Sequence, residues 1–148
     1  MILKPCAVQR GLIGEIITRI ERKGLQIVAM KMARLDDDVL RRHYAHLVDK
    51  PFFPSILASM EAAPVVLMCV EGKEAVEIMH IMAGSTNGRR AAFGTIRGDY
   101  AMSNQENIIH TSDTVENAKA ELDRFFVESD YCSYDPVTLP YVYAGDEL

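Results

Sequence analysis

The chain has 148 residues, of which 49% are hydrophobic and 25% charged, and its formal net charge is −5. This length fits one compact domain, and we expect a single domain over residues 1–148 with an irregular C-terminal tail over residues 128–148. The acidic balance argues against a protein that binds nucleic acid without sequence preference, because such proteins normally carry a basic excess. It does not exclude an enzyme that holds a small anion with a few local cations.

The cysteines and the hydropathy of the chain predict a cytoplasmic protein. The three cysteines are widely spaced and form no CxxC pair, so we expect neither structural disulfides nor a zinc site. No basic and then apolar leader opens the chain, and no apolar run is long enough to span a bilayer. We therefore expect a reducing compartment and no membrane partner.

The first third of the chain predicts a short extended piece, a helix and a strand. Residues 2–4 are extended up to Pro5, and apolar residues then recur at helical spacing over residues 12–20. That helix ends at Lys23-Gly24, a cation followed by the glycine that commonly terminates a helix. The apolar, partly β-branched run over residues 25–32 reads as a strand.

The acidic cluster Asp36-Asp37-Asp38 has two interpretations. It could bind a metal, or it could begin a helix, with an N-cap and acids facing the positive end of the helix dipole. Val39-Leu40 and Tyr44 continue a helical pattern, which favours the helix start.

The remaining elements complete an α+β pattern. Asp113 and Glu116 have the spacing of a capping box that would begin the last helix. We predict helices over residues 55–61, 75–82 and 113–125, a buried central strand over 65–70, a glycine-rich loop over 84–98 and a short edge strand over 107–110. This order fits a ferredoxin-like sandwich, in which helices pack on a four-stranded antiparallel sheet with βαββαβ topology and further helices are inserted.

His110 is the first candidate for chemistry. It follows an apolar strand end and precedes a helix start, where bound anions are favoured. Neutral imidazole is a nucleophile at neutral pH, and Glu121 could accept a hydrogen bond from its other ring nitrogen and fix the tautomer. On its position alone, however, a histidine at a strand end is more often structural than catalytic, so the surrounding residues must support the catalytic interpretation.

Three further side chains could bind parts of a phosphorylated ligand. Arg97 lies between glycines, which let backbone approach a ligand, and its guanidinium could clamp phosphate oxygens. Lys4 could act as a second cation, and Phe52 could offer an aromatic face to a base. Taken singly, the ordinary structural interpretation is favoured for all three: a surface ion pair for Arg97, a solvated strand end for Lys4 and a core residue for Phe52.

Together with their neighbours, these residues form a pattern that closely resembles the nucleoside diphosphate kinase family. The resemblance runs in order from Leu3 to about Phe126, and its last motif is the active-site signature of the family. The matching segments are Lys4-Pro5, Val8 to Ile16, His43-Tyr44, Lys50 to Phe53, Gly94 to Asp99 and Asn107 to Asp113.

The resemblance implies a ping-pong phosphoryl transfer between nucleoside triphosphates and diphosphates. His110 would take the γ-phosphoryl group as a phosphohistidine and pass it to a diphosphate. Glu121 would orient the histidine, Ser112 would join that network, and Tyr44 and Lys4 would line the phosphate end. The remaining implied nucleotide contacts are the phosphates for Arg97, Thr86 and the position of His80, the ribose for Asn107 and Lys4, and the base for Phe52.

The resemblance also implies a cofactor and an assembly. Mg²⁺ would arrive with the nucleotide and be held mainly through its phosphates, so no protein metal ligand is expected. Family members form homo-hexamers or tetramers. Gly88 replaces a proline common in the subunit-contact loop, whereas the long tail over 128–148 favours the hexamer.

Two alternatives use the same residues differently. One is a nucleotide-binding regulatory module with weakened turnover, suggested by His80 at a position where the family usually has arginine. The complete set argues against it, because a module without turnover has no chemical need for all of its members, namely His110, Glu121, Lys4, Arg97 and Asn107. The other is a protein-histidine phosphodonor, which the sequence does not distinguish from the first function.

The substitution at position 80 generates a prediction. Imidazole cannot reproduce the two-pronged, permanently charged clamp of a guanidinium, although Arg89 or Arg90 could reach in from the loop. We expect His80→Arg to lower the KM for nucleotides in steady-state assays while phosphoryl transfer itself is retained. An unchanged or higher KM would show that His80 does not weaken binding.

Overall fold

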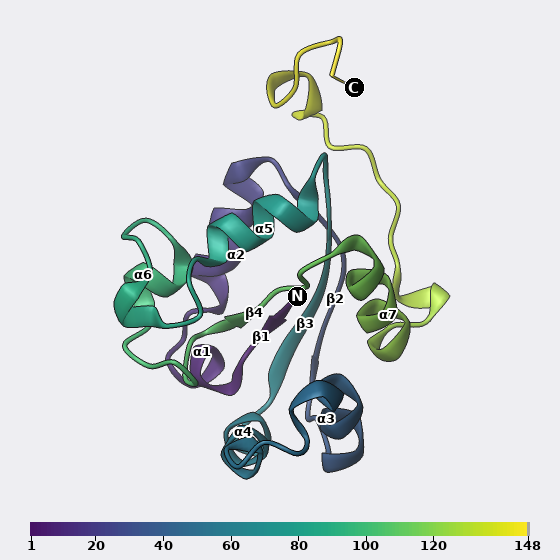
Figure 1. The fold of residues 1–148 in the computed structure, drawn as a ribbon. Helices are drawn as coiled ribbons and strands as arrows, with labels where there is room; N and C mark the ends of the chain where they lie inside the picture. Colours follow the sequence, from purple (N-terminus) through teal and green to yellow (C-terminus); the bar gives the residue numbers. More distant parts are fainter. Residues whose placement is uncertain (148) are drawn as a thin grey trace.

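The computed structural model describes residues 1–147, which form one four-stranded antiparallel sheet in the order β2-β3-β1-β4 (Figure 1). The strands are β1 (Ile2–Leu3), β2 (Gln26–Ala33), β3 (Val65–Glu71) and β4 (Ile109–His110). The helices are α1 (Pro5–Gln9), α2 (Ile13–Lys23), α3 (Asp37–His43), α4 (Phe53–Glu61), α5 (Ala75–Ala83), α6 (Ile96–Tyr100) and α7 (Val115–Phe125), with short 3₁₀ turns η1 (Ala45–Leu47), η2 (Gly88–Arg90), η3 (Glu128–Asp130) and η4 (Leu139–Tyr141). The predicted ferredoxin-like sandwich is confirmed.

Helices cover both faces of the sheet, so its central strand β3 is buried on both sides. Because successive side chains of a strand point to opposite faces, Val66 and Met68 pack with α2 and α5, whereas Val65 and Leu67 pack with α3 and α4. The unbroken apolar run in the sequence follows from this double burial. Within residues 1–147, no helix combines the length and hydropathy that crossing a bilayer requires.

Two helix boundaries agree with the predicted capping chemistry. The Asp36 side chain accepts a hydrogen bond from the backbone N–H of Val39 at 2.9 Å, so this acidic cluster begins α3. Gly24 ends α2 with a φ of 95°, the left-handed conformation that favours glycine.

The structure differs from the prediction at three other helix starts. Lys4-Pro5 is not only the end of a strand, because Pro5 occupies the first position of the short helix α1. The predicted loop over residues 84–98 contains the start of α6, where the Thr95 hydroxyl caps the backbone N–H of Gly98. The capping box predicted at Asp113 is wrong, since the N-cap of α7 is Thr114, which accepts from Asn117.

The C-terminal tail packs on the chain's own surface. From η3 onward it runs beside β2 toward the far end of the sheet (Figure 1). The backbone N–H of Cys132 donates to the Val28 carbonyl at 2.8 Å, and the Tyr134 hydroxyl donates to the Ile27 carbonyl at 3.1 Å. The tail therefore covers part of an edge that would otherwise present unpaired backbone groups.

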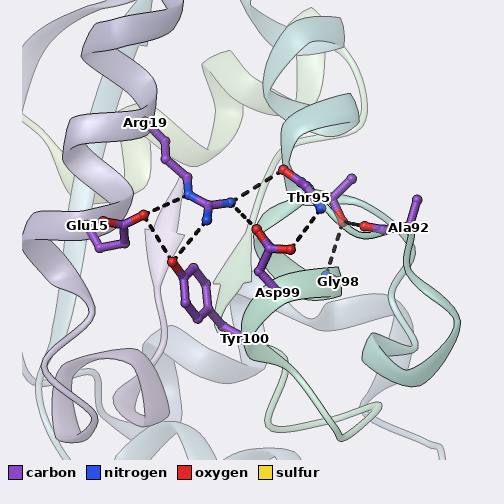
Figure 2. Close-up of polar contacts among 8 residues, drawn as sticks. Glu15, Arg19, Ala92, Thr95, Gly98, Asp99 and Tyr100 are labelled. Carbon is purple, nitrogen blue, oxygen red and sulfur yellow. Dashed lines mark hydrogen bonds and ion pairs between the residues drawn. The ribbon is translucent and has the colours of Figure 1, made fainter.

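An ion-pair network connects α2 to the segment that carries α6, as Figure 2 shows. Arg19 of α2 lies 2.7 Å from the Asp99 carboxylate and 3.0 Å from Glu15, and it donates to the Tyr100 hydroxyl at 2.9 Å. Asp99 in turn accepts from the backbone N–H of Gly94 at 2.8 Å. Arg19 therefore holds the turn over residues 94–100 against α2. Without Arg19, this turn would be held mainly by the Thr95 cap of α6.

Removing this network should loosen the segment over residues 94–100. We expect Arg19→Met to speed amide hydrogen exchange there about 5- to 10-fold, because local opening becomes easier when several polar contacts are lost together. The matched control is Arg22→Met, which removes an exposed cation from the same helix. Equal exchange rates in both variants would show that Arg19 does not hold the segment.

Candidate active site

A cleft of about 700 Å³ lies beside the edge strand β4. Ser112 does not line it but lies behind Glu121, beside a separate small cavity. The cleft is lined by all the other predicted site residues, namely Lys4, Tyr44, Phe52, His80, Thr86, Arg97, Asn107, His110 and Glu121. The fold thus brings together side chains from strands, helices and loops that are far apart in sequence.

The contact expected between His110 and Glu121 is present. Nε2 of His110 lies 2.8 Å from a carboxylate oxygen of Glu121, and the Ser112 hydroxyl donates to the same oxygen at 2.9 Å. His110 belongs to β4 and Glu121 to the second turn of α7, so the bond also fixes the helix against the strand.

The charge of Glu121 sets the tautomer of His110. Burial raises the pKa of the Glu121 carboxyl, but the hydrogen bond from His110, the nearby imidazoles and the Ser112 hydroxyl outweigh it and lower the pKa to about 2. An ionised carboxylate only accepts hydrogen bonds, so Nε2 of His110 carries the proton. Nδ1 therefore keeps its lone pair, and it is the ring atom that can act as the nucleophile.

Two aromatic rings at the C-terminal end of α3 pack against His110. The His43 ring lies 4.7 Å from the His110 ring at 75°, and the Tyr44 ring lies 6.3 Å away at 80°. Burial raises the pKa of Tyr44 to about 12, so its hydroxyl keeps its proton and can donate to an anion. The rings limit how His110 can turn.

Lys4 and Asn107 form a polar pair on the cleft wall. Nζ of Lys4 donates to the Asn107 side-chain oxygen at 2.6 Å and to the Gln105 carbonyl at 3.1 Å. The Asn107 amide donates in turn to the carbonyls of Thr86 and Asn104, each at 2.9 Å. Burial first, and then the charge of Arg97, lowers the pKa of Lys4 to about 8.

The backbone between Asn107 and His110 is strained. Ile108 is fully buried and has a φ of 74°, an outlying value for a β-branched residue. The N–H of Ile109 donates to the Asn107 carbonyl at 2.8 Å, which closes a tight three-residue turn around Ile108. This turn lets the side chains of Asn107 and His110, three residues apart, both line the cleft. The packing of the surrounding core keeps Ile108 in its strained backbone conformation.

The Arg97 guanidinium is buried and holds the loops around the cleft. It is 7% exposed and donates to the carbonyls of Asn107 at 3.3 Å, Gly84 at 2.7 Å and Ile109 at 2.7 Å. Burial lowers its pKa, but arginine remains charged at physiological pH. Arg97 therefore holds two backbone segments together, one at Gly84 and one at 107–109, and contributes a fixed positive charge to the cleft.

Two residues at the mouth of the cleft are exposed. Phe52 is 51% exposed and offers an open aromatic face, so it is not a core residue. The adjacent Phe53 is the one that packs in the core. The His80 side chain is 59% exposed and lies 3.8 Å from Asp113. Arg89 donates to the backbone carbonyl of Met102. The interpretation that Arg89 or Arg90 replaces the cation at position 80 is wrong in this conformation, since neither residue lines the cleft.

One cluster in the cleft has metal-ligand chemistry. The ligand atoms of His43, His110 and Glu121 lie within 4.8 Å of one another. Two imidazoles and one carboxylate are not the oxygen-rich set that Mg²⁺ prefers. This donor set therefore lacks the oxygen ligands of a typical Mg²⁺ site.

Sequence reasoning assigned no role to His43 and missed Arg124. Nη1 of Arg124 lies 3.1 Å from Nδ1 of His43, and both residues line the cleft. Arg124 follows Glu121 by three residues, the spacing that places two side chains on one face of a helix. That spacing could have identified Arg124, whereas the packing of His43 on His110 depends on tertiary structure.

Known proteins share this sequence and fold over nearly their whole length. A family model described as Nucleoside diphosphate kinase matches residues 1–131. A nucleoside diphosphate kinase of Parabacteroides distasonis is 54% identical over 148 residues, which is 100% of this chain and 97% of that relative. One of Rhodopirellula baltica is 46% identical and covers 99% of this chain and 97% of its own length.

Solved structures give the same result. The chain superposes on a halophilic nucleoside diphosphate kinase from Halobacterium salinarum in complex with CDP with a TM-score of 0.93 and 39% identity, over 96% of this chain and 95% of that one. A nucleoside diphosphate kinase family protein from Babesia bovis gives 0.91 and 37%, over 96% of each chain. The chain therefore belongs to the nucleoside diphosphate kinase family and is a phosphotransferase that acts on nucleotides.

Proposed function

We propose that this enzyme transfers the γ-phosphoryl group of a nucleoside triphosphate to a nucleoside diphosphate through a phosphohistidine at His110. The observation that carries the proposal is the bond from Nε2 of His110 to the ionised Glu121, because it leaves the lone pair of Nδ1 available. The regulatory-module alternative is not favoured, since that arrangement is the one a nucleophile requires.

The proposed reaction has two matched steps. In the first, the lone pair of His110 Nδ1 forms a bond to the γ-phosphorus, and the bond from that phosphorus to the bridging oxygen breaks, so the nucleoside diphosphate leaves with the electron pair. In the second, a terminal oxygen of another diphosphate attacks the same phosphorus and the P–N bond breaks. Glu121 stabilises the positive ring that exists while Nδ1 carries phosphorus.

The cations and donors of the cleft support this reaction by electrostatics. Phosphoryl transfer needs little covalent help from the protein, so positioned charge provides most of the catalysis. We assign Lys4, Arg97 and Thr86 to the phosphates, with Tyr44 donating its hydroxyl near His110. Asn107, bonded to Lys4, would hold the ribose, and the open face of Phe52 would stack on the base.

A bound Mg²⁺ would neutralise phosphate charge and orient the chain of phosphates, with its contacts made to the nucleotide. Phe52 would hold the base by stacking on its face and not by hydrogen bonds to its edge. Such a contact does not distinguish one base from another, so the enzyme would accept many different bases. We also propose action in the cytoplasm, which the three free cysteines support.

The assembly that we propose is a homo-oligomer, a hexamer in preference to a tetramer. Large apolar side chains remain exposed on the single chain, among them Met30 and Met32 of β2 and Phe93 near the segment held by Arg19. Phe93 is 93% exposed, and burial of its ring against another copy would be favourable. Exposed apolar residues at the end of the tail, among them Val137 and Tyr141, could extend the contact between copies and so favour the larger assembly.

The proposal is tested by intact mass after brief incubation with Mg·ATP and again after adding a pyrimidine nucleoside diphosphate. We expect one phosphoryl group to appear and then to be lost to the diphosphate. His110→Ala should bind nucleotide but never gain the group. An unmodified wild type that still binds ATP, or a modified His110→Ala, would contradict the proposed carrier.

The lowered pKa of Lys4 predicts that nucleotide binding weakens at alkaline pH. Below about pH 8 the amine of the free protein is charged and attracts phosphate, whereas above it the amine is neutral and binding must take up a proton. The dissociation constant for Mg·ADP should therefore rise up to about 10-fold per pH unit between pH 8 and 10, measured by calorimetry.

Lys4→Met should bind weakly at every pH and lose this slope. The control is Lys31→Met, which removes a lysine paired with Asp130 outside the cleft and should keep the wild-type slope. The same slope in Lys4→Met would assign the titration to another group.

A further inference from the structure

Arg124 differs from the other cations of the cleft because its partner is a neutral ring. Its Nη1 lies 3.1 Å from Nδ1 of His43, and within residues 1–147 no carboxylate lies at ion-pair distance from it. It projects from α7 one turn beyond Glu121, and it is partly buried. Arg124 is therefore not part of a surface ion pair, and its one side-chain partner among the described residues is the His43 ring.

The contact determines the protonation state of His43. A guanidinium only donates hydrogen bonds, so Nδ1 of His43 must accept and the ring proton must lie on Nε2. His43 is 7% exposed, and its Nε2 has no hydrogen-bond partner among the described residues. Burial, followed by the charges of His110 and Arg124, lowers the pKa of His43 to about 3 in spite of the opposing effect of Glu121.

His43 lies where a change in its charge would affect the nucleophile. Its ring packs edge-on against His110, and its ligand atom lies within 4.8 Å of those of His110 and Glu121. The charged or titratable groups facing it are His110, Glu121, Arg124, the amino group of Met1 and the Tyr44 ring, whose centroid lies 4.6 Å away. The added proton would lie on Nδ1, which faces Arg124, so a protonated His43 would repel Arg124. If the ring then turned, it would donate to Glu121 and compete with His110 for the carboxylate that fixes its tautomer.

We propose that Arg124 is a positioning residue for phosphoryl transfer: its guanidinium holds His43 neutral, in one tautomer and one orientation, so that Glu121 remains bonded to His110. This inference rests on the proposed role of His110. Arg124 acts through His43 and not through a direct contact with the nucleotide.

The kinetic test follows the rate of His110 phosphorylation by Mg·ATP in single turnovers between pH 5.5 and 8.5. Arg124→Met should be slowed about 10-fold near pH 6 and less at pH 8, with the nucleotide KM changed less than about twofold, because His43 can then gain a proton and turn. Arg124→Lys and Arg124→Gln both keep an N–H donor and should recover most of the rate. Lys119→Met, an exposed cation of the same helix outside the cleft, should match wild type.

A double-mutant cycle separates action through His43 from direct phosphate binding. On a His43→Asn background, Arg124→Met should have no further effect. An equal loss on both backgrounds, or rescue by lysine but not by glutamine, would overturn the proposal in favour of a phosphate contact.

A measurement on the resting protein is independent of turnover. Proton–nitrogen correlation spectra of the imidazoles should show His43 neutral with its proton on Nε2 in wild type down to about pH 5. In Arg124→Met the single tautomer should be lost and the ring should gain a proton at a higher pH than in wild type, although burial still opposes the charge. A proton on Nδ1 of His43 in wild type, or identical titrations in the two proteins, would overturn the proposal. Failure of His110 to become phosphorylated would instead refute the proposed function and leave this spectral result standing.

Discussion

The hydrogen bond from His110 to Glu121 is the constraint on which the rest of the site depends. It needs the last strand and the last long helix at one separation, because the strand supplies the ring and the helix supplies the carboxylate. The packing of Phe126 with the core on the same face keeps α7 in that position. A shift of about 1 Å would lengthen the bond past hydrogen-bonding distance and release the tautomer of His110. The antiparallel sheet is therefore part of the chemistry, since it fixes the atom that must react.

The cleft holds its positive charge in advance of the ligand. Lys4 and Arg97 are desolvated and near enough to lower the pKa of Lys4, which costs free energy in the empty protein. Backbone carbonyls and the Asn107 side chain offset part of that cost by accepting hydrogen bonds from both cations. Preorganised charge of this kind needs little reorganisation when phosphates arrive, which is how electrostatic catalysis gains its effect. The strain at Ile108 has the same origin, because the core maintains a conformation that an isolated chain would leave.

Much of the fold could be predicted from local pattern, and the misses share a physical cause. The helices with a full apolar stripe and the doubly buried strand over 65–71 were predicted because periodicity and burial agree over many residues. The short helices α1 and α6 are about one turn long, and they are stabilised by Pro5, by the Thr95 cap and by the Arg19 network. One turn is too short to show a periodic pattern of apolar residues, so the sequence pattern did not predict them. In the site, motif matching named nine of the residues that line the cleft, together with Ser112, which lies behind Glu121. It assigned no role to His43, because the packing of one ring on another depends on the tertiary structure and cannot be deduced from the spacing of residues in the sequence.

The distribution of charge explains how an acidic protein can bind a highly anionic ligand. The chain carries a net charge of −5, yet its cleft combines Lys4, Arg97 and Arg124 with only two carboxylates, of which Glu121 is already committed to His110. The surface acids therefore repel nucleotide generally, while the low-dielectric cleft attracts phosphate locally, where Coulomb interactions are strongest. Because screening by salt acts mainly on the exposed charges, the attraction inside the cleft persists at physiological ionic strength. Arg124 fits this division, since a cation that touches only a neutral ring adds positive potential beside the nucleophile without placing a competing acid there.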